Sequence, residues 1–368
     1  MAKPKINSWL LPFAWLYGLG VWLRNWLFEH GWLEQRTYPL PIIAVGNLTV
    51  GGTGKTPHVE YLLQLLSPLY VCAVLSRGYK RTTKGHVEAT HKSTALTLGD
   101  EPYQMHLKFR DKGVRVAVNA DRRAGIERLL RPRKHKSGRI IKSAAEVIVL
   151  DDAFQHRYVK PGLSILLTDY NRLYYEDALL PAGRLREPAI ESDRADIIIV
   201  TKCPRTLNAF HLTQLRNELG TNASQMVYFT TFAYGTPYPL YADQSTPLQQ
   251  EDTVLVLAGI ARPAGFIKAM KGRYHVVKSL CFADHHNFSK ADVARINSTL
   301  AHLPQGTRII TTEKDAVRLI ASSGLSTEVQ AALWVQPIVV EFLDNGQQSF
   351  NTKIIDYVRK NQSHGRLA

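Results

Sequence analysis

The sequence has few cysteines, and their spacing excludes two classes of stabilising site. Cys72, Cys203 and Cys281 are far apart and form neither a C-x-x-C motif nor a Cys/His ligand pattern. This argues against a structural zinc ion and against a disulfide framework, and it fits a reducing compartment. We expect each cysteine to be a small buried side chain.

Acidic residues are also scarce relative to basic ones. The 368 residues include 31 Asp and Glu against 46 Lys and Arg, which gives a formal net charge of +15 and a pI near 9.7. Such a balance favours polyanionic partners, namely nucleic acid, an anionic membrane surface or phosphorylated substrates. Composition alone does not choose among them. The length is sufficient for two domains.

Long unbroken hydrophobic runs are missing, and residues 6–23 come closest to one. This stretch has no charged residue, and its length is at the lower limit for a membrane-spanning helix. Polar and helix-weakening residues such as Asn7, Pro12 and Gly18 reduce its hydrophobicity. No small-x-small cleavage site follows, so a cleaved signal peptide is not expected.

The same N-terminal region holds five of the six tryptophans. Trp15, Leu19, Trp22 and Trp26 recur at the spacing of one helical face. Tryptophan favours the headgroup level of a bilayer, and nearby basic residues such as Arg24 would meet anionic lipid. We therefore predict an interfacial helix within residues 1–36. A single membrane span and a stripe packed on the protein core are the alternatives.

Beyond this helix, short apolar β-branched runs alternate with helical patterns. Such runs predict a mostly parallel sheet covered on both faces, and so an α/β fold. The expected strands of the first series are residues 41–45, 70–76, 114–118, 146–150, 164–169 and 196–201. We assign residues 37–225 to this P-loop kinase domain, residues 226–243 to extended linker strands and residues 244–368 to a smaller C-terminal α/β domain. The basic stretch 128–142 is expected to be an exposed helix end and loop.

A glycine-rich loop follows the first strand. The general phosphate loop is G-x-x-x-x-G-K-[ST], but threonine stands where its first glycine belongs. Glycines elsewhere in the loop still permit several amides to face one anion, and the following helix N-terminus adds its dipole. We predict that this loop binds the nucleotide phosphates, with Lys55 reaching the β/γ-phosphates. The predicted nucleotide-binding residues are Thr49, Val50, Gly51, Gly52, Thr53, Gly54, Lys55 and Thr56.

Two adjacent acids end the strand at residues 146–150. Asp151 and Asp152 are placed to meet the Mg²⁺ of a nucleotide held by the loop, where the Thr56 hydroxyl would also bind the metal. A capping role for the two acids is the alternative. ATP is favoured over GTP because Pro204 stands where a guanine-reading Asp would follow Thr201-Lys202.

Two further polar clusters are candidates for chemistry. Asp100 precedes a predicted helix, where it is either a simple N-cap or a base for an attacking hydroxyl. Residues 282–289 contain His285 and His286, for which a catalytic or orienting role competes with a surface loop and with metal ligation. Residues 169–188 contain Arg186 and Glu187, which are available for an anionic ligand or Mg²⁺, and an ordinary loop is the alternative.

These motifs together resemble the tetraacyldisaccharide 4′-kinase family of lipid A biosynthesis. The matching segments are VGNLTVGGTGKTP, LSRGYKR, GDEP, LDDAFQHR, DYNR, LLPAGRLREP, AGIARPAGF, ADHHNF and TTEKDAVRL. They run in order through most of the chain. The resemblance implies a P-loop kinase domain, a smaller C-terminal domain and an N-terminal helix that meets the bilayer.

The resemblance also implies residue roles. The family's catalytic Asp matches Asp100, and its assisting histidine matches His285, although spacing does not separate His285 from His286. The Mg²⁺-associated acids match Asp151, Asp152 and Glu187. The arginine of the SRGY segment matches Arg77, which we expect to contact the substrate together with Gln155 and Arg186.

The function implied is phosphorylation by ATP of the 4′-hydroxyl of a tetraacylated glucosamine disaccharide 1-phosphate. The implied location is the cytoplasmic face of the inner membrane, with peripheral attachment through the N-terminal helix to anionic lipid. No nucleic-acid partner is expected, because residues 128–142 lack the interleaved aromatics of a stacking platform. The alternative hypothesis is a membrane-associated P-loop ATPase or switch that has no small-molecule acceptor.

Overall fold

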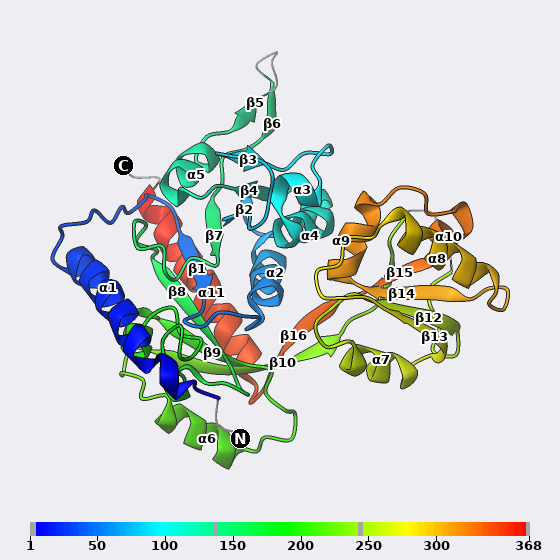
Figure 1. Cartoon of the computed structure of the whole chain (residues 1–368). Helices are drawn as coiled ribbons and strands as arrows, with labels where there is room; N and C mark the ends of the chain where they lie inside the picture. The colour runs from blue at the N-terminus through cyan, green and yellow to red at the C-terminus, as the bar shows by residue number, and fades with distance from the viewer. Residues whose placement is uncertain (1–4, 135–138, 242–245, 366–368) are drawn as a thin grey trace.

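The computed structural model describes residues 5–134, 139–241 and 246–365. Two α/β units lie beside each other, and a helix near the N-terminus lies on the side of the larger unit away from the smaller one (Figure 1). Both units are built on mostly parallel sheets with helices on their faces. The α/β fold class predicted from the sequence is therefore confirmed.

The larger unit contains a nine-stranded sheet. Its strands are β1 (Ile42–Gly46), β2 (Cys72–Ser76), β3 (Val87–Glu88), β4 (Arg115–Val118), β7 (Val147–Asp151), β8 (Leu163–Asp169), β9 (Ile197–Thr201), β10 (Met226–Tyr234) and β16 (Ile338–Phe342). Their spatial order is β16-β10-β9-β8-β1-β7-β2-β4-β3. The strands from β10 to β4 are mutually parallel, and β16 and β3 join the two edges antiparallel. All six strands expected in the first series are present.

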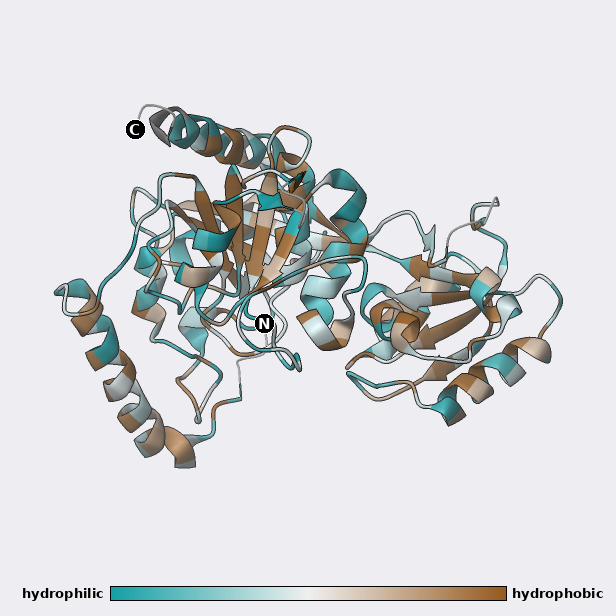
Figure 2. Ribbon diagram, turned by 90° about the horizontal axis from the view of Figure 1, so that it is seen from above, coloured by the Kyte–Doolittle hydropathy of each residue, from teal (hydrophilic) through white to brown (hydrophobic). Residues whose placement is uncertain are grey.

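Helices cover both faces of this sheet. They are α2 (Lys55–Leu66), α3 (Ala95–Leu98), α4 (Asp100–Phe109), α5 (Arg122–Leu129), α6 (Ala209–Glu218) and α11 (Gly346–Gly365). Because side chains alternate along a strand, Ile43 and Val45 of β1 join the core under α2, α4 and α11. Ile42 and Ala44 join the core under α5 instead. Burial on both faces explains the continuous apolar runs in the sequence, which are brown in Figure 2.

The smaller unit contains a five-stranded sheet. Its strands are β11 (Tyr238–Pro239), β12 (Thr253–Ala258), β13 (His275–Cys281), β14 (Arg308–Thr312) and β15 (Leu333–Gln336), in the order β11-β15-β14-β12-β13. Its helices are α7 (Pro263–Lys271), α8 (Lys290–Ala301), α9 (Glu313–Ala321) and α10 (Thr327–Ala332). Phe266 of α7 packs on one face of the sheet, and Ile296 of α8 packs on the other.

The chain leaves the larger unit through β10 and returns to it through β16. These two strands pair antiparallel, from Thr230 opposite Phe342 to Tyr234 opposite Ile338. Helix α11 then packs against the larger sheet, with Phe350 in its core (Figure 1). This arrangement differs from the prediction that residues 226–243 are linker strands and that residues 244–368 form one C-terminal domain. The sequence shows that β16 and α11 are apolar on one face, but it does not show to which of the two sheets they belong.

The N-terminal helix α1 (Leu11–Glu29) follows a short 3-10 turn, η1 (Ser8–Leu10). One side of α1 is buried against the larger unit through Ala14, Val21 and Phe28. Large apolar side chains remain exposed on the rest of its surface, among them Trp15 and Trp22. Among the described residues, no helix has both the length and the apolarity to cross a membrane.

The basic stretch 128–142 differs from the expected helix end and loop. Its first residues end α5, and the rest includes a two-stranded antiparallel pair, β5 (Arg133–Lys134) with β6 (Ile140–Lys142). Residues 135–138 lie outside the described residues. The prediction that all three cysteines are buried is wrong for Cys281, which is exposed at the end of β13. The remaining short 3-10 turns are η2 (Arg110–Lys112), η3 (Tyr174–Glu176) and η4 (Ala189–Arg194).

Candidate active site

The glycine-rich loop connects β1 to α2 at the carboxyl edge of the larger sheet. Gly51 and Gly54 have φ values of 114° and 86°, which side chains with a Cβ rarely adopt. A Cβ on Gly54 would also lie 2.4 Å from the Phe232 ring. These torsions turn the chain so that α2 begins at Lys55 with its N-terminal amides facing the loop, which is the geometry that binds phosphate.

Thr49, in place of the usual first glycine, lies in a short extended segment. It forms an antiparallel bridge with Leu185, and the Val50 amide donates to the Arg184 carbonyl at 2.8 Å. The side chain of Thr49 is buried. The loop is therefore held against residues 184–185 by backbone pairing, which needs no glycine torsion at position 49.

Lys55 lies in a network of polar side chains at the start of α2. Its Nζ donates to Asn47 Oδ1 at 3.1 Å and lies 3.5 Å from Asp152 Oδ1. The Arg186 guanidinium donates to the Asn47 carbonyl at 3.1 Å and to Asp152 Oδ1 at 2.9 Å. Asn47 is fully buried, so it fixes both cations relative to the loop.

Asp151 and Asp152 follow each other at the end of β7 but differ in environment. Asp151 is buried and accepts a hydrogen bond from Ser76 Oγ at 2.9 Å. Burial, together with the charge of Asp152, raises the pKa of Asp151 to about 6. Burial also acts on Asp152, but Lys55 and Arg186 outweigh it and lower the pKa of Asp152. A buried carboxyl with a raised pKa gains from a nearby cation.

Glu187 was predicted as a Mg²⁺-associated acid, and the structure surrounds it with protein cations. Its side chain is fully buried, and its Oε2 accepts from Arg194 Nη2 at 2.6 Å. Oε2 also lies 3.3 Å from Gln155 Nε2, and Oε1 lies 3.7 Å from Arg24 Nη1. Gln155 Nε2 donates at 2.9 Å to the Asn47 carbonyl as well. Glu187 is thus linked to the loop through Gln155.

Asp100 is the first residue of α4 and meets the smaller unit. Its Oδ2 accepts hydrogen bonds from both Nε and Nη2 of Arg318, a residue of α9. His285 Nδ1 lies 3.6 Å from the same oxygen and 2.7 Å from Arg318 Nη2. His286 points elsewhere, because its Nε2 is 2.9 Å from Asp292 Oδ2, in the N-terminal cap of α8. The structure therefore brings His285, and not His286, to Asp100.

The Asp100 cluster and the phosphate loop face the same region. Asp100 begins α4 directly after Gly99, which lies against Gly78 and Tyr79 just beyond the carboxyl end of β2, the neighbour of β7 in the sheet. Arg77, predicted as a substrate contact, is exposed just after β2. It makes no hydrogen bond or ion pair with any of the described residues.

Helix α1 is docked beside this region. The Tyr17 hydroxyl donates to the Arg186 carbonyl at 2.8 Å, and Asn25 Nδ2 donates to Glu191 Oε1 at 2.6 Å. Arg24 donates to the Gln155 carbonyl. The helix with the exposed tryptophans is therefore fastened to the segments that support the phosphate loop.

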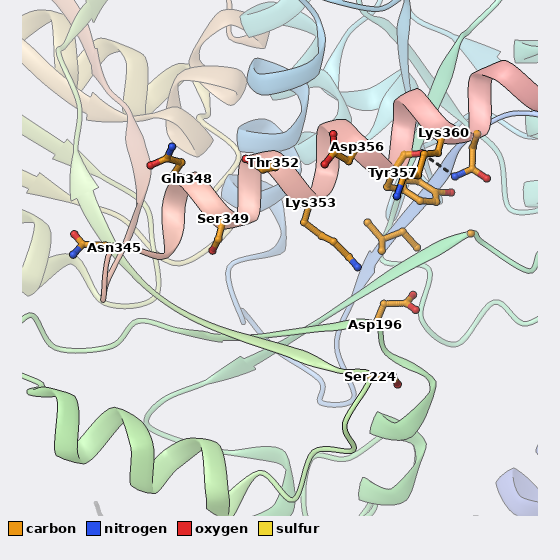
Figure 3. A pocket seen from close by; sticks show the side chains of 13 residues that line it. Asp196, Ser224, Asn345, Gln348, Ser349, Thr352, Lys353, Asp356, Tyr357 and Lys360 are labelled. Atoms are coloured by element: carbon orange, nitrogen blue, oxygen red, sulfur yellow. Dashed lines mark hydrogen bonds between the residues drawn. The ribbon is translucent and has the colours of Figure 1, made fainter.

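A pocket of about 750 Å³ lies under α11. It is at the amino ends of β8 and β9, whereas the phosphate loop is at the carboxyl end of β1. Lys353, Asp356 and Tyr357 line it together with Asp196, which precedes β9 (Figure 3). The Tyr357 hydroxyl pairs with the backbone of Ile42 at the start of β1. Ligands of open parallel sheets bind at the carboxyl ends of the strands, and so this pocket is separate from the phosphate loop.

The sequence prediction missed three residues of the region: Asn47, Ser76 and Arg318. Asn47 and Ser76 end or follow apolar strands, and a polar residue in that position is a usable signal. Arg318 lies in the TTEKDAVRL segment that matches the family, but its place in an amphipathic helix does not indicate its partner. Its approach to Asp100, 218 positions away, depends on how the two units meet.

Comparisons with known proteins give the family. A family model described as LpxK, tetraacyldisaccharide-1-P 4′-kinase, matches residues 6–359. The chain is 48% identical to a tetraacyldisaccharide 4′-kinase of Bacteroides fragilis, covering 99% of this chain and 96% of that one. It is 41% identical to one of Porphyromonas gingivalis, covering 98% and 99%.

A solved structure agrees with these sequence matches. The crystal structure of LpxK from Aquifex aeolicus in complex with ATP superposes with a TM-score of 0.73 at 29% identity, covering 95% of this chain and 99% of that one. With matches of this extent in both sequence and structure, the chain belongs to the tetraacyldisaccharide 4′-kinase family.

Proposed function

We propose that this chain transfers the γ-phosphoryl group of ATP to the 4′-hydroxyl of a tetraacylated glucosamine disaccharide 1-phosphate in lipid A biosynthesis. Membership of the family supports the reaction. The observation that carries the proposal for this chain is the placement of Asp100, paired with Arg318 and next to His285, at the same carboxyl end of the sheet as the phosphate loop.

The loop amides, the N-terminus of α2 and Lys55 would hold the ATP phosphates and neutralise their charge. In the transfer, the acceptor oxygen forms a bond to the γ-phosphorus while the bond from that phosphorus to the ADP oxygen breaks. Asp100 would take the proton of the acceptor hydroxyl. His285 Nδ1 lies 3.6 Å from Asp100 Oδ2, and His285 would assist the proton transfer from this position.

Mg²⁺ fits the chemistry of the residues at this edge. Asp151 is a buried carboxyl whose pKa is raised to about 6, and Thr56 lies in the first turn of α2. Within residues 5–134, 139–241 and 246–365, no three His, Cys, Asp or Glu side chains are grouped to hold a metal ion. A magnesium ion that keeps waters and phosphate oxygens as ligands needs only one or two carboxylates. When bound, it would neutralise charge on the phosphates.

We further propose a division of roles among the predicted metal and substrate residues. Asp151 and Thr56 hold the ion, with Asp152 beside them. Glu187, Gln155 and Arg186 organise the loop: Gln155 Nε2 and Arg186 Nη2 both donate to the Asn47 carbonyl, and Glu187 Oε2 accepts from Arg194. Exposed Arg77 is the remaining candidate for an anionic group of the acceptor.

We propose that α1 attaches the enzyme peripherally to the cytoplasmic face of the inner membrane, where the acyl chains of the acceptor reside. Trp9, Trp15 and Trp22 are 90%, 73% and 56% exposed, and the net charge of +15 favours anionic lipid. The opposite side of the helix is bound to the loop-supporting segments. Membrane attachment through α1 would therefore place the catalytic edge near the headgroups.

The test of the reaction is transfer of ³²P from ATP to a tetraacyl disaccharide 1-phosphate in anionic vesicles, using the purified full-length protein. We expect labelled lipid only when the disaccharide is present. ATP turnover that is the same with and without the disaccharide would contradict the proposal and support an ATPase or switch instead.

The test of membrane attachment is sedimentation with vesicles that contain anionic lipid. The double variant Trp15→Ser/Trp22→Ser should lose most of its vesicle binding. Phe210→Ser removes a side chain that is 74% exposed on α6 and serves as the matched control. Equal binding by the double variant and the wild type would exclude α1 as the attachment site.

A further inference from the structure

Arg318 of α9 contacts both residues of the Asp100–His285 pair. Its side chain is only 5% exposed, and its Nε lies 3.2 Å from Asp100 Oδ2, with Nη2 bound to the same oxygen. Nη2 also lies 2.7 Å from His285 Nδ1. A guanidinium fixed by burial thus connects a carboxylate of the larger unit with an imidazole of the smaller one.

The contact with Arg318 sets the tautomer of His285. A guanidinium nitrogen is a donor and has no acceptor, so the imidazole nitrogen that faces it must accept. His285 Nδ1 is therefore unprotonated, and the ring proton lies on Nε2. The 3.6 Å between Nδ1 and Asp100 Oδ2 is too long for a hydrogen bond. Asp100 is paired with Arg318 and not with the imidazole.

The two carboxylate oxygens of Asp100 have different surroundings. Both guanidinium nitrogens and the imidazole approach Oδ2. Within the described part of the chain, no group hydrogen-bonds to Oδ1. Arg318 therefore holds the carboxylate by Oδ2 and leaves Oδ1 available to the acceptor hydroxyl.

A second contact between α4 and α9 reinforces this placement. Lys108, near the end of α4, donates to Glu313 Oε1 at the start of α9 at 2.8 Å. Asp100 at the start of α4 meets Arg318 near the end of α9. The two helices thus lie antiparallel, with an ion pair toward each end. Arg318 reaches Asp100 only when the smaller unit is docked in this way.

We propose that Arg318 is a positioning residue of the phosphoryl transfer, which holds Asp100 by Oδ2 and His285 as the Nε2–H tautomer when the two units are docked. This rests on the proposed function of the site. Arg318 does not contact the phosphate loop in the described residues, so its role is confined to the acceptor side and leaves ATP binding intact.

The test compares Arg318→Ala, Arg318→Lys and Arg295→Ala in the full-length protein; Arg295 is an exposed arginine of α8 and the matched control. We expect Arg318→Ala to lower kcat roughly 100-fold with the KM for ATP within about threefold of wild type. Arg318→Lys should keep a higher kcat than Arg318→Ala. Guanidinium added to Arg318→Ala should restore part of its kcat. Unchanged kcat, or a loss that follows the loss of ATP binding and thermal stability, would overturn the proposal.

A second readout is independent of activity. ¹⁵N NMR of histidine-labelled protein, with the His285 signal assigned from the His285→Gln variant, should show the Nε2–H tautomer in wild type and a mixture in Arg318→Ala. An unchanged tautomer in Arg318→Ala would overturn the positioning role. If wild type transfers no phosphate to the lipid but this tautomer shift occurs, the proposed reaction fails while the role of Arg318 in setting His285 stands.

Discussion

The two halves of the catalytic region are built differently. The nucleotide half is contained in the larger unit, where Asn47, Lys55, Asp152 and Arg186 are joined by several hydrogen bonds and ion pairs. The acceptor half combines Asp100 of the larger unit with two residues of the smaller one. The first is a property of one folded unit, and the second exists only where two units meet.

This difference separates binding from transfer. Changes that disturb the contact between the units should leave the phosphate loop formed and ATP bound, while they remove the oriented base. Changes within the loop network should affect both. Domain closure that completes a catalytic group is a recurring way to couple substrate binding to chemistry.

The largest effect is expected from Lys55→Ala, which removes a cation from the nucleotide half. Loss of its charge at the phosphates should lower transfer roughly 10³-fold and also weaken ATP binding. Steady-state transfer and equilibrium ATP binding measure the two effects. Lys353→Ala, on α11 at the opposite edge, should leave both within twofold of wild type. ATP-binding affinity equal to wild type in Lys55→Ala would show that the lysine acts in transfer alone.

Lys108→Ala should disturb the contact between the units instead. Lys108 bridges Glu60 of α2 and Glu313 of α9, whose side chains are 5% and 7% exposed. Burial and Glu313 already raise the pKa of Glu60 to about 7, so loss of the lysine leaves two buried acids without their cation. We expect a loss of about 3 kcal/mol in the free energy of unfolding.

In Lys108→Ala, phosphoryl transfer should also fall by a larger factor than the affinity for ATP. Steady-state transfer and equilibrium ATP binding measure the two quantities. The exposed Lys92 supplies the control variant, Lys92→Ala, for which stability and transfer should be unchanged. The triple variant Lys108→Met/Glu60→Gln/Glu313→Gln should recover much of the stability, because it removes the buried charges together. Equal losses of transfer and ATP binding in Lys108→Ala would break the proposed separation of the two halves.

Features set by local sequence patterns were predicted correctly, whereas features set by long-range packing were not. The phosphate loop and the acids after β7 lie within short strand-loop-helix segments, where residue types alone specify the backbone and its chemistry. The apolar strands likewise predicted the parallel sheets. The return of β16 to the larger sheet was not predicted, because a short apolar strand fits either sheet.

The sequence also did not predict which side chains that are distant in sequence contact one another. Glu187 was predicted beside a metal, yet Arg24 and Arg194 converge on it from α1 and η4. The pairing of Arg318 with Asp100 depends on the docking of two units, and no local motif encodes it. His285 and His286 have the same local pattern, and only the tertiary contacts distinguish them.

A smaller effect is expected from pH and concerns the support of the nucleotide half. His58 of α2 is buried, with Nδ1 2.8 Å from the Gly54 carbonyl and Nε2 3.1 Å from Thr230 Oγ1. Burial lowers the pKa of His58 to about 4. The neutral ring therefore contributes stability that is complete above the unfolded pKa of about 6.5 and is lost as the pH falls toward 4.

Thermal unfolding of wild type and His58→Gln at pH 7.5 and pH 5 measures this contribution. We expect wild type to lose more stability than the variant between the two pH values, by up to roughly 2 kcal/mol. Other groups titrate in both proteins, and so the difference between the two proteins isolates His58. Parallel pH profiles would show that the histidine does not resist protonation in the folded state.

The most direct test of the central claim is Asp100→Asn, measured for ATP binding and for phosphoryl transfer to the lipid disaccharide in the same preparation. Asparagine keeps the shape of the side chain but removes the base. We predict ATP binding within about threefold of wild type and transfer lowered roughly 10³-fold. Transfer near the wild-type rate, or loss of ATP binding together with transfer, would contradict an acceptor half that is distinct from the nucleotide half.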